Sequence, residues 1–174
     1  MPDHKTISVL QIGSCPQGTS ETLKKIMSYK DQLAKTDLLV MPEATLGGYP
    51  KGESFGTQLG FRLESGRDTY QKYFDAAVDL AGPEIDTLCD LASRTETSII
   101  VGVIERAGST LYCTALFIDP EHGLTHKHRK LMPTGSERLI WGQGDGSTLP
   151  VIETKAGKTS AVICWENYMP LLRT

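Results

Sequence analysis

The chain has 174 residues, enough for one domain with a substantial core, and its 39% hydrophobic and 22% charged content is ordinary for a globular protein. A net charge of -3 argues against a nucleic-acid or membrane-surface role, because such proteins usually carry a basic face. The chain shows no signal-peptide pattern and no apolar run of bilayer-spanning length, so we expect a cytoplasmic protein without a membrane partner.

The first part of the chain predicts a parallel β-α-β unit. Residues 7–12 and 37–41 are short β-prone runs, and the residues between them have helical spacing, with Thr19 or Ser20 as the cap. The apolar face of this single helix is predicted to consist of Leu23, Ile26, Met27, Leu33 and Ala34. Since the crossover is parallel, both strands end at one edge of the sheet, where Glu43 follows the second strand.

The middle of the chain predicts a long loop and two helices. Residues 47–66 are rich in Gly, Tyr, Pro, Ser and Phe, which is typical of a functional loop that covers a pocket. A helix capped by Asp68 or Thr69 follows, and Pro83 is suited to the first position of the next one. Cys89 falls on the buried stripe of that second helix, so we expect it to be a core residue.

The remaining chain predicts more strands and a mixed sheet. Residues 98–104 form a third buried strand, and residues 111–118 and 124–128 continue it as an antiparallel meander. A hairpin over residues 151–153 and 159–163 then leads to Cys164. Residues 161–163 are typical of a strand buried on both faces, which would hold Cys164 at the rim of the sheet.

Glu43, Lys130 and Cys164 are the residues best suited to chemistry. A free thiol has a pKa of about 8.5, so a nucleophilic cysteine needs a neighbouring base or cation, and a carboxylate and an ammonium supply both. None of the four cysteines forms a CxxC pair, which argues against a structural zinc site. We therefore expect reduced thiols and no bound metal.

Other interpretations exist for the polar and charged segments near these residues. The run HKHRK at residues 126–130 fits a solvated basic strand end, while His126 or His128 offers a rival cysteine–histidine dyad. Glu137 and Arg138 fit a surface ion pair by their spacing. The loop WGQGDGS at residues 141–147 lacks the ending of a phosphate-binding loop.

Three blocks of the sequence resemble the signature blocks of the nitrilase branch of the carbon-nitrogen hydrolase superfamily. These blocks are MPEATLGGYPKG at 41–52, HRKLMPTGSERLIWGQGDGS at 128–147 and CWENYMPLLR at 164–173. The resemblance spans the whole chain and implies an αββα sandwich with mixed sheets. It also implies a catalytic set of Glu43, Lys130 and Cys164, with Glu137 as a second glutamate, and substrate contacts from Tyr49, Trp165 and Glu166.

The activity that the resemblance implies is conversion of a nitrile to a carboxylic acid and ammonia through a thioimidate and a thioester on the cysteine. A small nitrile is the only partner required, with no metal or organic cofactor. The sequence around Cys164 is more similar to nitrilases and cyanide-converting enzymes than to amidases, so a cyanide-converting enzyme is an alternative.

Members of this family continue well beyond the nucleophile, whereas this chain stops at residue 174. We therefore expect residues 1–174 to form a single, C-terminally truncated domain whose sandwich is incomplete. The family implies a homo-oligomer for a complete chain. The alternative is a non-catalytic or split fragment that needs a complementing C-terminal chain.

Overall fold

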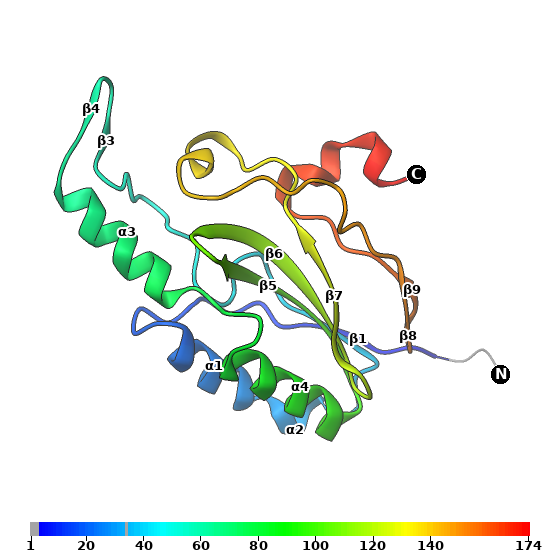
Figure 1. The fold of residues 1–174 in the computed structure, drawn as a ribbon. Coiled ribbons are helices and arrows are strands. Elements are labelled where there is room, and N and C mark those ends of the chain that lie inside the picture. The colour runs from blue at the N-terminus through cyan, green and yellow to red at the C-terminus, as the bar shows by residue number, and fades with distance from the viewer. Residues whose placement is uncertain (1–3, 34) are drawn as a thin grey trace.

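The computed structural model describes residues 4–33 and 35–174, and its centre is a five-stranded sheet in the order β1-β2-β5-β6-β7 (Figure 1). The strands are β1 (Ile7–Val9), β2 (Leu38–Val40), β5 (Ser98–Ala107), β6 (Thr110–Asp119) and β7 (Gly123–Arg129). β1, β2 and β5 pair in parallel, whereas β5, β6 and β7 pair antiparallel. The predicted parallel crossover, the meander and the mixed sheet are therefore confirmed.

Helices cover one face of this sheet. They are α1 (Thr19–Met27), α2 (Lys30–Leu33) and α4 (Pro83–Thr95). Their buried side chains pack on alternate residues of β2, β5 and β6; the cluster includes Leu23, Ile26, Leu33, Leu88, Leu39, Ile99, Val101 and Leu116. The single helix predicted after residue 19 is instead two, because α1 ends at Met27 with Ser28 as its C-cap. Ala34 lies outside the described residues.

Two local predictions for the helical layer are confirmed. Pro83 occupies the start of α4, where its missing N–H has no intrahelical partner to lose. Cys89, on the same helix, is partly buried and packs against the core cluster of the helical face.

The predicted loop over residues 47–66 contains structure of its own. It includes a small antiparallel hairpin of β3 (Thr57–Gln58) and β4 (Phe61–Arg62), and α3 (Ser65–Ala76) begins within it. The helix begins three residues before the predicted cap at Asp68. Gly66 permits this early start, since a Cβ there would lie 2.0 Å from the carbonyl oxygen of Phe55.

A short hairpin packs on the opposite face of the central sheet. Its strands are β8 (Ile152–Thr154) and β9 (Gly157–Thr159), which form a separate two-stranded sheet. Ile152 and Ala156 pack against Leu38, Ile100 and Phe117 of the central sheet. The described chain is thus layered as helices, central sheet and hairpin (Figure 1).

The strand predicted over residues 159–163 is wrong beyond Thr159. β9 ends at Thr159, and residues 160–163 form no ladder with any described strand. Ala161 packs on the central sheet, and Ile163 is buried in the neighbouring core cluster. A short apolar run satisfies burial either within a sheet or lying across one, so Cys164 lies over the face of the sheet and not at its rim.

Three short 3-10 helices complete the described elements. They span Gly135–Leu139, Cys164–Tyr168 and Pro170–Leu172, the last two in place of the helix predicted from residue 167. None of the helices in the described part of the chain is long and apolar enough to cross a membrane.

Candidate active site

Glu43 projects from a bulge between β2 and β5. The chain leaves the ladder after β2 and pairs with β5 again at Leu46. Between them Pro42 has no N–H to donate and Ala44 has a φ of 53°, so the chain bulges. A Cβ on Gly102 would lie 2.3 Å from the carbonyl oxygen of Pro42 and 2.6 Å from the Cα of Glu43. Glycine at position 102 therefore allows the bulge to lie directly on β5.

Lys130 follows β7 and is buried between two carboxylates. Its Nζ lies 2.8 Å from Oε1 of Glu43 and 2.8 Å from Oε2 of Glu137. The same Nζ lies 5.5 Å from the ring centroid of Trp141. Burial opposes the charged form, but the bonds to Glu137 and Glu43 outweigh it and raise the pKa of Lys130. Lys130 therefore stays charged at neutral pH.

Glu137 is held by donors from three directions. Besides Lys130, the backbone N–H of Thr134 lies 2.6 Å from Oε2, and the hydroxyl of Tyr49 lies 2.8 Å from Oε1. Burial opposes ionisation, but these donors together lower the pKa of Glu137, while the bond to Glu137 raises the pKa of Tyr49 to about 12. The surface pair with Arg138 does not form, because Arg138 donates to the carbonyl of Pro133.

Cys164 is exposed and shares a cavity with Glu43. The cavity has a volume of about 230 Å³ between residues 161–164 and the face of the central sheet. Cys164 opens its 3-10 helix with a φ of 56°, a left-handed conformation that costs a non-glycine residue of the order of 1 kcal/mol or more. The structure thus brings Glu43, Lys130 and Glu137 into one bonded cluster and places Cys164 on the cavity that Glu43 lines.

A second thiol, Cys113, lines the same cavity, although no motif in the sequence marks it. The Sγ of Cys113 donates to Oε1 of Glu43 at 3.4 Å. Burial raises the pKa of the Cys113 thiol well above its ordinary value, and the nearby Glu43 adds to this. Cys113 therefore remains a neutral donor to Glu43. The strand alternation on β6 was the available signal, because it puts Cys113 on the same face as Ala115.

Glu166 and His128 form a fully buried pair beside Cys164. Oε2 of Glu166 lies 2.8 Å from Nε2 of His128, whose Nδ1 lies 2.7 Å from the carbonyl oxygen of Thr148. Burial opposes the charge on each partner, but their mutual bond raises the pKa of His128 and lowers that of Glu166. With both ring nitrogens occupied, His128 does not serve as the base of a cysteine–histidine dyad.

The residues predicted to contact substrate have three different environments. Tyr49 lines a second cavity of about 300 Å³ together with Glu137. Trp165 is exposed beside Cys164, with its ring centroid 5.0 Å from that of Tyr168. Glu166 is buried within its own hydrogen bonds, so its contacts favour a structural task near the site over direct contact with substrate.

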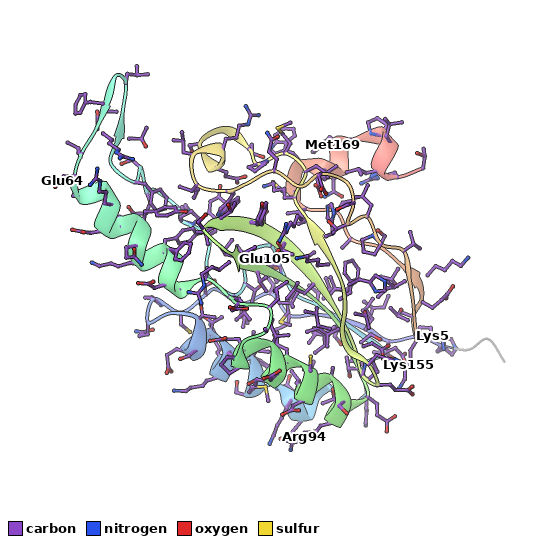
Figure 2. All side chains as sticks on the ribbon, in the orientation of Figure 1. Lys5, Glu64, Arg94, Glu105, Lys155 and Met169 are labelled. Atoms are coloured by element: carbon purple, nitrogen blue, oxygen red, sulfur yellow. The ribbon has the colours of Figure 1, made fainter. Side chains whose placement is uncertain are left out.

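The basic run at residues 126–130 is solvated at His126, which is exposed, but its other four residues are buried or half-buried. Lys127 and Arg129 point to the helical face, where both bind Oε1 of Glu105 at 2.6 Å. Glu105 is labelled on the central sheet in Figure 2. His128 and Lys130 point to the opposite face, which carries the cavity. The positive charges of Lys127, Arg129 and Lys130 are thus matched by buried carboxylates, and the run offers no free patch for nucleic acid.

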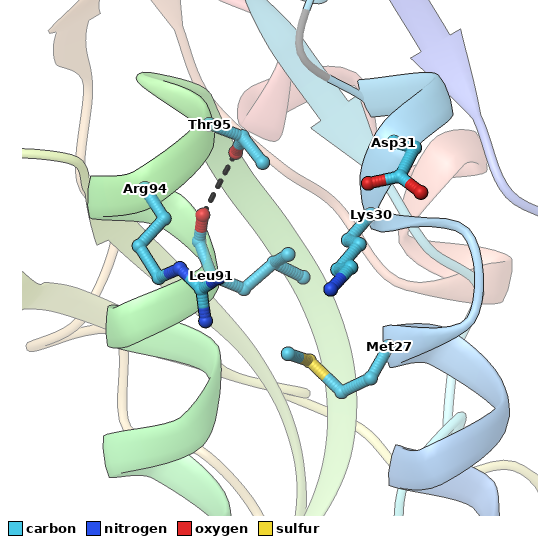
Figure 3. Close-up of a pocket in the computed structure, with 6 residues that line it drawn as sticks. All are labelled: Met27, Lys30, Asp31, Leu91, Arg94 and Thr95. Carbon is cyan, nitrogen blue, oxygen red and sulfur yellow. Dashed lines mark hydrogen bonds between the residues drawn. The ribbon is translucent and has the colours of Figure 1, made fainter.

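A further cavity, of about 150 Å³, lies between the helices on the other face (Figure 3). Met27 and Leu91 form its apolar wall, and Lys30, Asp31 and Arg94 add charge. It shares no lining residue with the cavity of Cys164. In residues 4–33 and 35–174 no group of three His, Cys, Asp or Glu side chains is arranged to hold a metal ion.

Several solved structures have a shape similar to that of this chain. A carbon-nitrogen hydrolase superfamily protein of Xanthomonas campestris has a TM-score of 0.72 at 20% identity, covering 97% of this chain and 57% of that chain. Nit3 of Saccharomyces cerevisiae has a TM-score of 0.65 at 22% identity, covering 97% and 58%. These similarities show the fold that the sequence predicted.

Sequence relatives are closer. The chain is 49% identical to a nitrilase of Bradyrhizobium diazoefficiens, covering 99% of this chain and 54% of that protein. It is 47% identical to Nitrilase 2 of Arabidopsis thaliana, covering 96% and 50%. The chain thus spans about half the length of these curated relatives. The family model for carbon-nitrogen hydrolases matches residues 6–174, and the chain therefore belongs to the carbon-nitrogen hydrolase family.

Proposed function

We propose that this chain carries the nucleophile half of a nitrilase, which converts a nitrile and two water molecules into a carboxylic acid and ammonia. The observation that carries the proposal is the buried ammonium of Lys130 between Glu43 and Glu137, with Glu43 lining the cavity of Cys164. The identity of 47–49% to proteins named nitrilases supports this reaction over hydrolysis of amides.

In the first half of the proposed reaction, Glu43 takes the proton of the Cys164 thiol. The thiolate attacks the nitrile carbon, and a C–S bond forms as one C–N π bond breaks, which gives a thioimidate. Lys130 donates a hydrogen bond to the nitrogen, where negative charge develops. Glu137 keeps Lys130 in this position.

In the second half, water replaces nitrogen and then sulfur. Glu43 removes a proton from the first water, which adds to the thioimidate carbon, and ammonia leaves after protonation of its nitrogen. A second water attacks the resulting thioester, and the carboxylic acid leaves as the thiol re-forms. Every proton passes through Glu43 or Lys130, so the scheme requires no cofactor.

Replacement of the nucleophile tests this proposal. We expect Cys164→Ala to abolish ammonia release from every nitrile that the chain converts, because no other described thiol is exposed on the cavity. Cys15→Ala, which removes a thiol outside the cavity, is the matched control and should keep full activity. Turnover that survives in Cys164→Ala would exclude the covalent scheme. A panel of aliphatic, aromatic and arylaceto nitriles together with cyanide would identify the substrate class.

A second candidate rests on apolar side chains around the nucleophile. Trp165, Tyr168 and Leu171 are all exposed on the short helices that begin with Cys164. In this candidate residues 1–174 fold as one domain that needs a second polypeptide, either a complementing chain or another copy of itself, to cover this surface and become active. Co-expression with the C-terminal half of a relative would then restore ammonia release, whereas full activity of a monomer would reject the candidate.

A further inference from the structure

The carboxylate of Glu166 binds the chain on both sides of the proposed active site. Oε2 accepts the N–H of Ile163, the residue before Cys164, at 2.6 Å. Oε1 accepts the N–H of Leu131, the residue after Lys130, at 2.7 Å. Oε2 also bonds His128, two residues before Lys130. One side chain therefore joins the segment that carries the nucleophile to the segment that carries the cation.

The hydrogen bonds of Glu166 lie next to a strained backbone conformation at Cys164. The left-handed backbone of Cys164 is unfavourable for a residue with a Cβ, and it persists only where its surroundings impose it. Residues 160–163 form no ladder with the described strands, so sheet hydrogen bonds do not hold the chain before Cys164. The Ile163 N–H bond to Glu166 anchors the residue directly before the strained position.

We infer that Glu166, fixed by His128, is a positioning residue that sets the Sγ of Cys164 against the Nζ of Lys130. The inference deepens the proposed function and rests on it. Glu166 itself touches neither substrate nor reacting atoms in this scheme. Glu166 instead sets the separation and orientation of the Cys164 thiol and the Lys130 ammonium. A misplacement of about 1 Å in such reacting groups costs about 10²-fold in rate.

The two acceptor oxygens of the Glu166 carboxylate allow a direct test of this inference. All three partners of Glu166 are nitrogen atoms, and both of its oxygens are needed as acceptors. A glutamine has one acceptor oxygen and one NH₂ group, so Glu166→Gln must set a donor against a backbone N–H on one side. The variant keeps the size of the side chain but breaks the connection between the two segments.

Glu105 provides a matched control. It is a buried carboxylate with several donors, namely Lys127, Arg129 and Thr114, and it lies on the helical face of the same strands. Glu105→Gln therefore disturbs a charged cluster of the same kind without touching the chain around Cys164. Comparison of the two variants separates a positioning effect from a general loss of stability.

The experiment measures kcat and KM for ammonia release in the 174-residue chain and in both variants. It also measures the rate at which iodoacetamide alkylates Cys164, followed by peptide mass spectrometry. For Glu166→Gln we expect kcat to fall by about 10²-fold while KM changes less than about twofold, since the loss lies in the arrangement of reacting groups. Alkylation of Cys164 should slow as well, and both rates should be unchanged in Glu105→Gln.

His128→Asn serves as a second variant if Glu166→Gln does not fold, because it leaves both backbone N–H bonds to Glu166 in place. It should lower kcat in the same direction. Unchanged kcat and alkylation in folded Glu166→Gln, or equal losses in Glu105→Gln, would overturn the inference. If the unsubstituted chain hydrolyses no nitrile, the proposed function fails, and the alkylation rates alone decide whether Glu166 positions the thiol.

Discussion

At the scale of single residues, the cluster around Lys130 holds two negative charges and one positive charge. Lys130→Met leaves Glu43 and Glu137 facing each other without a cation, and breaking a buried pair in this way costs about 3–5 kcal/mol. We expect that loss in urea unfolding, together with loss of ammonia release. Adding Glu137→Gln should recover part of the stability but none of the activity.

The control for this prediction is Lys24→Met on α1. Lys24 pairs with Glu21 at the surface, where an ion pair contributes about 0–1 kcal/mol. If Lys130→Met cost no more than Lys24→Met, the buried cluster would not be a unit, and the role of Glu137 in holding Lys130 would be lost with it.

The sequence predicted this cluster only in part. Residue type and local pattern pointed to Glu43, Lys130 and Cys164 because each follows a strand or lies at a loop. The same reasoning gave Glu137 a surface partner in Arg138, and only the family resemblance placed it with Lys130. A bond between residues seven apart across a turn, or 38 apart as in His128 and Glu166, has no local signature in one sequence.

At the scale of elements, the bulge that carries Glu43 depends on Gly102. We expect Gly102→Ala to push the bulge away from β5, at a cost of about 1–3 kcal/mol for overpacking, and to lower kcat through displacement of Glu43. Gly13→Ala is the control, because a Cβ there meets nothing within 4 Å. Urea unfolding and ammonia release measure both effects. Equal stability and activity in the two variants would contradict the role of Gly102.

Elements that depend on a few adjacent residues were predictable from the sequence, whereas elements that depend on contacts with distant segments were not. Proline at the start of α4 and the apolar periodicity of α1 are properties of a few adjacent residues. Residues 160–163 have the apolar composition of a buried strand, but they pack on the face of the central sheet and do not pair with its strands. Periodicity reports that a segment is buried without reporting what covers it.

At the scale of the whole molecule, three buried carboxylates make the fold sensitive to acid. Burial would raise the pKa of Glu105, Glu137 and Glu166, but their donors outweigh it, so each pKa is lowered in the folded protein. Such a group stabilises the fold at pH above its unfolded value of about 4.3 and ceases to do so as the pH falls through its folded value. The free energy of unfolding should therefore fall below about pH 4.3.

His128 causes a loss of stability at higher pH. Its pKa is raised, so its contribution is complete below the unfolded value of about 6.5 and is lost as the pH rises through the folded value. Urea unfolding across this range should show greatest stability between the two limits. Glu105→Gln should flatten the acid slope alone, and a slope identical to that of the unsubstituted chain would contradict the assignment.

The alternation of residues 127–130 across β7 has a consequence for how the strand finds its place. Odd residues of the run meet Glu105 on one face, while even residues meet Glu166, Glu43 and Glu137 on the other. Slippage by one residue would exchange the faces of every side chain. A β7 shifted by one residue would thus bury cations without counter-ions and leave buried carboxylates without partners. The charge pairs therefore favour the observed register of β7 over the shifted one during folding.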